Sequence, residues 1–462
     1  MSGAERVARL RASRKAPTAR RSVCDHRLAP VLSGLGAPLL DPTPVRTGLD
    51  RFPKPTKILS KAKLFAAWKG SRDSTSDPGR PGIDGITAEQ FALRLDERLS
   101  ILADALRTGK YHPSRLKPVF IPKPNSEKDR LICIPVIRDR VVQKAIVNYL
   151  VSTDKLPVEN EFSFGFIAGK GTSNAIDRAL DLRRKYGWCL KTDIEAFFDR
   201  IARSDAKTRV AKALGKSSLT PLIHSFIDCE IRQTKFTQPK LAKQGIKEGR
   251  GLRQGMPLSP LLANLVLSDF DASFRAKKIE MVRYADDLLL FFHSKRDAQD
   301  GFDFVKSQLA TQGLTIPELG DETSKTQIVA PRMPVTFLGL ELVHYEATGR
   351  YEKRVGRKQI AKIERRLEEQ YSFENLRKER VNFQQANVDL SRSISSYLGI
   401  YRGTYDFPLV ESELRRIARQ VLEALFEDVF GLDVLRRVTP EGREFLGLGK
   451  MDILEESDPF EV

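Results

Sequence analysis

Two adjacent acids lie between strand-like segments at residues 282–292, and this stretch limits the possible folds more than any other. Val282 and Tyr284 favour extended structure, residues 285–287 can make a tight turn, and residues 288–292 form an apolar run of strand length. Carboxylates flanked by buried strands cost several kcal/mol of desolvation unless cations neutralise them. Asp286 and Asp287 therefore indicate a divalent-metal site, although an ordinary hairpin turn would be the better interpretation of an isolated acid pair.

A second strand-like segment, residues 188–194, carries another acid, Asp193, near its end. Two divalent ions about 3.5–4 Å apart promote phosphoryl transfer when carboxylates from separate elements share them. Asp193, Asp286 and Asp287 would supply that set, which disfavours the hairpin-turn alternative. The sequence therefore predicts a site for two Mg2+ ions, with Mn2+ as a substitute.

The chain is strongly basic, with a net charge of +18 and a pI of 9.7 over 462 residues. Lysine and arginine neutralise phosphates, so a nucleic-acid partner explains this excess better than a basic surface without a partner. The four cysteines show no zinc-ligand spacing, no apolar run reaches membrane-spanning length, and the N-terminus has no apolar secretory segment. We therefore expect a cytoplasmic protein without a membrane partner.

Several longer motifs follow one another along the chain. Residues 164–172 read Phe-Gly-Phe-Ile-Ala-Gly-Lys-Gly-Thr, residues 254–264 read Gln-Gly-Met-Pro-Leu-Ser-Pro-Leu-Leu-Ala-Asn, and residues 284–287 read Tyr-Ala-Asp-Asp. The first is not a P-loop, because Gly171 stands where Ser or Thr is required after the lysine. Together the motifs resemble bacterial reverse transcriptases of the group II intron-like or stand-alone, defence-associated (unknown-group) kind. The resemblance is strong over residues 80–345 and weak over residues 350–430.

The resemblance implies an α+β fold, a right-hand polymerase with fingers, a palm of antiparallel sheet backed by helices, and a helical thumb. We expect a basic, flexible segment at residues 1–50, fingers and palm at 51–345, the thumb at 346–430 and a tail of unknown role at 431–462. Apolar residues at helical spacing fit this expectation. They occur at 91–106 behind a Thr87–Gln90 capping box, at 302–309, and in three stripes beyond residue 350.

The resemblance also assigns a nucleotide site. Lys123 and Arg130, near the tip of a predicted hairpin, would hold the triphosphate, since two cations can clamp such a group. Phe198 would lie under the sugar and exclude a 2′-hydroxyl, with a core position as the alternative. Gln254 would contact the sugar, and Gly255 would leave room for it.

Further assignments follow from the same resemblance. Ile194 would add a backbone carbonyl to the metal shell. Lys325 is a candidate general acid for the departing pyrophosphate, with a solvent-exposed lysine as the alternative. The primer grip would comprise Phe337, Leu338 and Gly339.

Residues 203–250 are expected to be helical and basic. Their cations would lie near the primer or template strand, or on a solvated face: Lys235, Lys240, Lys243, Lys247 and Arg250.

The activity that the resemblance implies is RNA-directed DNA polymerisation, with deoxynucleotides added to a primer 3′-hydroxyl or to a protein hydroxyl. We expect an RNA template, a DNA product, a dedicated noncoding RNA partner and a role in bacterial antiviral defence; oligomerisation is left open. A retron or group II intron-type enzyme is the alternative. An RNA-binding scaffold or splicing factor on a polymerase fold would not need the three acids, and Phe198 argues against an RNA-directed RNA polymerase.

Overall fold

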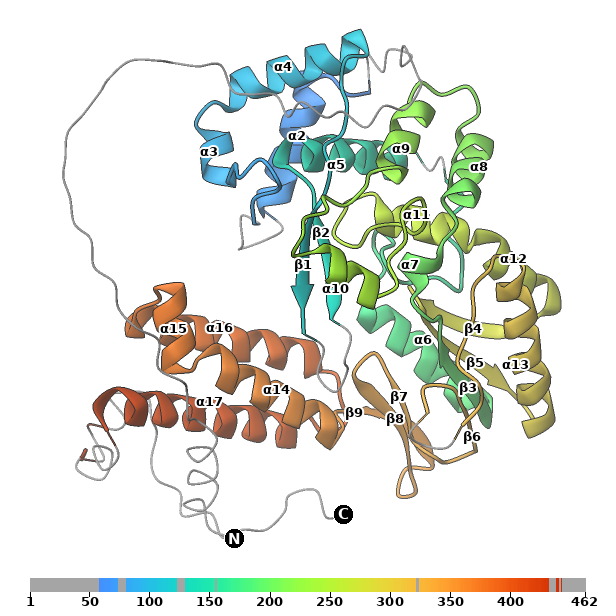
Figure 1. Ribbon diagram of the computed structural model, residues 1–462. Helices are drawn as coiled ribbons and strands as arrows, with labels where there is room; N and C mark the ends of the chain where they lie inside the picture. Colours follow the sequence, from blue (N-terminus) through green and yellow to red (C-terminus); the bar gives the residue numbers. More distant parts are fainter. Residues whose placement is uncertain are drawn as a thin grey trace. The chain divides into compact units, whose positions relative to one another are not determined.

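The computed structural model describes residues 58–73, 80–122, 129–153, 156–320 and 324–431, together with 438, 439 and 442 (Figure 1). All of them belong to one compact unit, Val45–Val462. The expected N-terminal segment at 1–50 and nearly all of the expected tail at 431–462 lie outside the described residues. No helix in the described part of the chain is both long enough and apolar enough to cross a bilayer.

A four-stranded sheet lies at the centre of the fold. Its order is β4-β5-β3-β6, and every neighbouring pair is antiparallel. The strands are β3 (Trp188–Asp193), β4 (Glu280–Tyr284), β5 (Asp287–Phe292) and β6 (Gln327–Val329).

Both faces of this sheet are buried, which explains the continuous apolar run in β5. Leu288 and Leu290 join the hydrophobic cluster of Phe302 in α13 (Lys295–Ala310). Leu289 belongs to a second cluster, which contains Ala179 of α6 (Thr172–Lys185). Alternate side chains of a strand point to opposite faces, so the strand must be apolar on both. The helix expected at 302–309 is confirmed as the second half of α13.

Further helices contribute buried residues to the first hydrophobic cluster. The Ser259-Pro260 pair begins α11 as the sequence predicts, with proline in the first turn where no amide donor is lost. These helices are α7 (Phe197–Arg200), α8 (Arg203–Leu214), α9 (Thr220–Ile227), α10 (Gln238–Lys243), α11 (Ser259–Val266) and α12 (Ser268–Lys277).

The N-terminal region combines helices with a β-hairpin. It contains α2 (Lys61–Asp73), α3 (Ala88–Ala92), α4 (Leu95–Thr108) and α5 (Ile137–Ser152), with strands β1 (Lys117–Ile121) and β2 (Arg130–Ile134). The capping box is confirmed, because Gln90 N donates to Thr87 Oγ1 at 3.2 Å and Thr87 N donates to Gln90 Oε1 at 3.0 Å. The single helix expected over 91–106 is instead broken at residues 93–94, so that Phe91 packs on Trp68 while α4 takes its own direction.

The C-terminal region begins with a three-stranded sheet, β7 (Val335–Phe337), β8 (Leu340–Tyr345) and β9 (Arg350–Arg354). The sequence did not predict β9, which pairs with β8 across the expected boundary at residue 346. Four helices follow: α14 (Arg357–Gln370), α15 (Phe373–Glu379), α16 (Phe383–Tyr401) and α17 (Phe407–Phe430). The apolar stripes of α14 and α17 are buried as predicted, whereas on α16 Leu398 is only half-buried and Tyr401 is buried instead. The fold class is therefore α+β.

Candidate active site

Three carboxylates meet at one edge of the central sheet. The register pairs Asp193, the last residue of β3, with Asp287, the first residue of β5. Tyr284 also pairs with Asp287, so Ala285 and Asp286 form a two-residue turn between β4 and β5. Ile194 N donates to the carbonyl of Asp286 at 3.0 Å, which ties this turn to the end of β3. Residues almost a hundred positions apart in the sequence are thereby held at one place.

The turn adopts a backbone conformation that is unfavourable for its residues. Ala285 has φ +57°, in the left-handed region that costs a residue with a Cβ roughly 1–2 kcal/mol. Gly165 lies against it, and a Cβ on Gly165 would come within 2.6 Å of Ala285 N. The glycine in the Phe-Gly-Phe segment is therefore required by this close approach.

A fully buried arginine, Arg283, stabilises the turn from behind. Its guanidinium donates to both carboxylate oxygens of Asp271 at 2.8 and 2.5 Å, and to Asn264 Oδ1 at 2.9 Å. It also donates to the carbonyl of Ala285 at 3.3 Å. Asn264 in turn donates to the carbonyl of Gly165 at 2.8 Å. One cation thus connects α12, α11, the glycine segment and the acidic turn.

Sequence reasoning missed the role of Arg283. A charged residue inside a strand gives no local sign of a buried partner, and Asp271 lies on a helix whose pattern is only weakly amphipathic. Of the side chains that bind Arg283, only that of Asn264 belongs to a sequence motif, at the end of residues 254–264.

The three acids repel one another and are partly removed from water. Loss of hydration, and then the charges of Asp286 and Asp193, raise the pKa of Asp287 to about 6. Loss of hydration also raises the pKa of Asp286, with Asp193 adding to the shift and Lys325 and Arg130 opposing it. The site disfavours the negative charge of its own carboxylates, and bound cations would stabilise that charge.

Lys325, the candidate general acid, lies beside this cluster. Its Nζ forms an ion pair with Asp193 Oδ2 at 2.5 Å, and this hydrogen bond raises the pKa of Lys325. The other oxygen, Asp193 Oδ1, is buried and has no hydrogen-bond partner in the described structure. A buried acceptor without a partner is costly, and a cation would satisfy it.

The donor set fits Mg2+, which prefers carboxylate oxygens. The unpartnered Asp193 Oδ1 and the raised pKa values of Asp286 and Asp287 support this fit. Within the described ranges, no three His, Cys, Asp or Glu side chains are arranged closely enough to hold a metal ion, and Lys325 takes one oxygen of Asp193. The oxygen of Asp193 that Lys325 leaves without a partner, Oδ1, is therefore the one available to a cation.

The predicted triphosphate site is described in part. Arg130 opens β2, is exposed, and lies near enough to Asp286 to lower the pKa of that carboxyl group. Lys123 lies outside the described residues. The carbonyl of Gln254 accepts from Cys133 N in β2 at 2.7 Å, and Gly255 has φ +101°, with its missing Cβ only 2.5 Å from the carbonyl of Cys133. Contact with the hairpin is therefore one reason that residue 255 is glycine.

The two adjacent phenylalanines of α7 differ in burial. Phe197 is buried, whereas Phe198 is half-buried, and their ring centroids are 5.4 Å apart. The carbonyl of Phe198 accepts from Leu252 N at 2.8 Å, so α7 is connected to the chain just before the residue 254–264 segment.

The predicted primer grip belongs to a different sheet from the carboxylates. Phe337 is buried at the end of β7, and Leu338 and Gly339 form the turn to β8 with φ +50° and +86°. Two consecutive positive φ values are typical of a tight hairpin turn.

These observations define a polymerase palm: an antiparallel sheet with catalytic-type carboxylates at the end of one strand and in the adjacent hairpin turn, beside a cation-bearing hairpin. Residues 121–342 match the family model described as reverse transcriptase (RNA-dependent DNA polymerase). The chain therefore carries a reverse transcriptase domain.

Three curated relatives share parts of the sequence. Protein YkfC of Escherichia coli (strain K12) is 30% identical over 47% of this chain and 54% of its own length. Group II intron-encoded protein LtrA of Lactococcus lactis subsp. cremoris is 28% identical over 41% of this chain and 30% of its own. Retron Ec86 reverse transcriptase of Escherichia coli is 32% identical over 25% of this chain and 34% of its own length. The chain thus spans about half or less of each relative.

The raised pKa of Asp287 predicts a stability change with pH in the absence of divalent ions. An ordinary aspartate has a pKa of about 3.9, so between that value and about 6 the folded protein binds a proton more tightly than the unfolded chain. Stability should then fall as pH rises from about 4 to about 6, and Asp287→Asn should reduce this fall. Urea denaturation at a series of pH values, with EDTA present, measures it.

The matched control is Asp303→Asn, which removes an exposed carboxylate from α13. It should leave the pH dependence of stability unchanged. If Asp287→Asn and wild type show the same dependence, the proposed crowding of the three carboxylates is wrong.

Proposed function

We propose that this protein is an RNA-directed DNA polymerase. The observation that supports this most strongly is the cluster of Asp193, Asp286 and Asp287 at one sheet edge, with an unpartnered buried oxygen. In the proposed reaction the primer 3′-hydroxyl attacks the α-phosphorus of a deoxynucleotide, and pyrophosphate leaves. Two bound divalent ions, Mg2+ or Mn2+, would neutralise the developing charge and favour the deprotonated hydroxyl.

Side chains of the protein would bind the cations and the triphosphate, donate a proton and select the sugar. The three aspartates hold the cations, and Arg130, together with Lys123, holds the triphosphate through charge-assisted hydrogen bonds. Lys325, already beside the carboxylates, is placed to give a proton to the departing pyrophosphate. Phe198, half-buried next to this edge of the sheet, would exclude a 2′-hydroxyl from the sugar position.

The double variant Asp286→Asn/Asp287→Asn tests the proposed reaction. Loss of the charges that hold the cations should lower primer extension on an RNA template by at least about 100-fold, while RNA binding is kept. Extension with Mg2+ and the four deoxynucleotides, followed on a denaturing gel, measures it.

Asp300→Asn/Asp303→Asn removes two exposed charges from α13 and serves as the control. It should extend primers like the wild type. Equal extension by the double active-site variant would exclude the proposed chemistry.

Nucleotide selectivity tests the role of Phe198. A smaller side chain would leave space for a 2′-hydroxyl, so Phe198→Val should narrow the preference for deoxynucleotides by about 10-fold or more. Single-nucleotide incorporation with deoxy- and ribonucleotides measures the ratio. Phe197→Leu, at the buried neighbour, should keep the wild-type ratio, and an unchanged ratio in Phe198→Val would assign that ring to packing alone.

For the biological role we propose a cytoplasmic enzyme that works with a dedicated noncoding RNA in bacterial antiviral defence. The net charge of +18 supports an RNA partner. The retron relative and the intron-encoded relative support the alternative of a retron or group II intron-type enzyme. A scaffold or splicing factor with no polymerase activity is the candidate of a different class. RNA binding alone does not require the cluster of Asp193, Asp286 and Asp287.

Nucleic acid that copurifies with the protein separates these roles. A dedicated partner predicts one small RNA enriched on both the wild type and Asp286→Asn/Asp287→Asn, with new DNA only on the wild type. Sequencing of the bound RNA and DNA measures this. A broad mixture of RNAs would contradict the dedicated partner, and bound RNA without DNA from any primer would favour the scaffold.

A further inference from the structure

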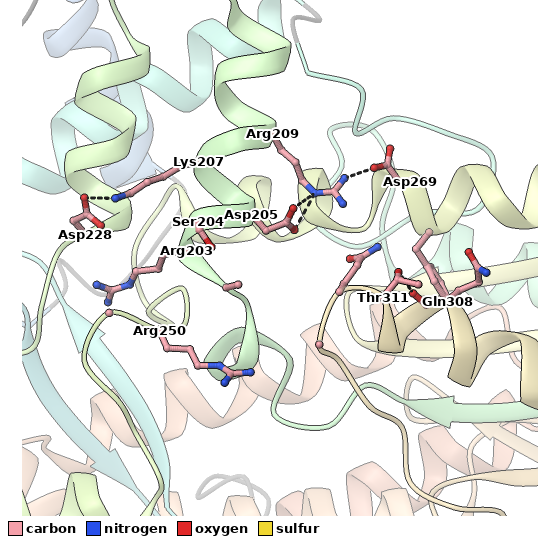
Figure 2. Close-up of a pocket in the computed structure, with 15 residues that line it drawn as sticks. Arg203, Ser204, Asp205, Lys207, Arg209, Asp228, Arg250, Asp269, Gln308 and Thr311 are labelled. Carbon is pink, nitrogen blue, oxygen red and sulfur yellow. Dashed lines mark hydrogen bonds and ion pairs between the residues drawn. The ribbon is translucent and has the colours of Figure 1, made fainter.

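A cavity of about 840 Å3 is lined in part by charged residues that pair with one another. It lies where α8, α12 and the end of α13 meet (Figure 2). Lys207 pairs with Asp228 at 2.5 Å, and Arg209 pairs with Asp205 at 3.0 Å and with Asp269 at 2.7 Å. Lys207 and Arg209 are therefore neutralised by carboxylates that line the same cavity.

Residues 232–250, of which Gly249 and Arg250 also line this cavity, carry an exposed aromatic ring, Phe236. Phe236 is 88% exposed, more than any other large apolar side chain in the described part of the chain. The loop that presents it is fixed, because Thr234 N donates to Thr237 Oγ1 at 2.8 Å and Thr237 N donates to Thr234 Oγ1 at 3.2 Å. A large apolar ring that stays exposed to water lacks the stabilisation that burial would provide. We therefore expect a partner to cover it.

Cations are frequent along the chain on both sides of this ring. Residues 232–250 contain six lysines and arginines and one acid, Glu248, whose side chain accepts from Gln233 at 2.9 Å. The six cations are exposed, and none forms an ion pair with another described residue. We call this the Phe236 surface: Phe236 with Arg232, Lys235, Lys240, Lys243, Lys247 and Arg250.

The Phe236 surface adjoins the β1–β2 hairpin. Leu116 N donates to the carbonyl of Glu230 at 2.9 Å, and Arg232 N donates to the carbonyl of Leu116 at 2.8 Å. Lys240 Nζ lies 5.4 Å from the centre of the Phe120 ring in β1, and α10 lies beside the hairpin in Figure 1. The other strand, β2, carries Arg130, which lies near enough to Asp286 to lower the pKa of that carboxyl group, so the hairpin connects the surface with the carboxylate site.

We infer that the Phe236 surface binds single-stranded RNA, with a base stacked on Phe236 and phosphates on the cations of this surface. An exposed aromatic ring among lysines is the usual arrangement for unpaired bases, because every base offers a flat face and the backbone supplies charge. A duplex keeps its bases stacked on one another and cannot use the ring. Given the proposed function, the bound strand is template that has not yet entered the carboxylate site.

The stacking contact is tested with a fluorescent, unstructured RNA of adenines and cytosines and with a blunt RNA duplex. Phe236→Ala should weaken binding of the single strand by about 5-fold to 100-fold, and Phe236→Trp should keep it. Binding of the duplex should not change. Leu93→Ala, at a residue that is 84% exposed, is the control for removing a surface apolar side chain and should behave as wild type.

The charge contacts are tested through salt dependence. Each lost phosphate contact lowers the slope of log K against log salt by about 0.7 for a single strand. Lys235→Ala/Lys243→Ala/Lys247→Ala should therefore reduce the slope by about 2 units. The control Lys63→Ala/Lys295→Ala/Arg296→Ala removes the same charge from exposed positions on α2 and α13 and should leave the slope unchanged.

Each outcome separates this inference from the proposed function. If the wild type extends primers but Phe236→Ala binds single-stranded RNA as tightly as wild type, the inference is overturned and the polymerase stands. If no extension occurs but the ring and charge variants weaken single-strand binding as stated, the surface stands and the polymerase falls. If Phe236→Ala weakens binding of the duplex as much as binding of the single strand, the inference is overturned. It is also overturned if a protein partner covers Phe236 and the variants do not change RNA binding.

Discussion

The interaction on which this structure most depends is the ion pair between Arg283 and Asp271, both shielded from water. Two charges in a low-dielectric interior are tolerated only when their remaining donors and acceptors are satisfied. Arg283 meets this condition by also donating to Asn264 and to the turn carbonyl of Ala285. Loss of one partner would leave a buried charge, which typically costs about 3–5 kcal/mol. The left-handed Ala285, the close Gly165 and the position of Asp286 all rest on this one guanidinium.

The same arrangement explains how a costly site can persist. The central sheet is covered on both faces, and its strands supply the packing that outweighs three crowded carboxylates at their ends. Those carboxylates disfavour their own charged forms, and Lys325 partly relieves them through Asp193. Stability given up at such a place is commonly linked to function, since the strain is relieved when the right cation or substrate binds.

Much of the site could be predicted because it follows local rules. β-forming residues, a tight turn and an apolar run predicted Asp286 and Asp287 between two strands, and a strand-like run predicted Asp193 near the end of another. The structure brings all three to one edge. The capping box and the apolar stripes of α13, α14 and α17 are also local patterns. What failed depends on tertiary contacts. The break between α3 and α4 follows from packing on Trp68, β9 exists because β8 pairs with it, and Arg283 shows its importance only beside Asp271.

The central claim is that the three aspartates hold two divalent ions during nucleotide addition. The most direct measurement is anomalous diffraction from crystals grown with Mn2+, an RNA template, a DNA primer and a non-hydrolysable deoxynucleotide. Two manganese peaks are expected among Asp193, Asp286 and Asp287, with one ion bound to Asp193 Oδ1. A primer and nucleotide bound without manganese at these carboxylates would contradict it.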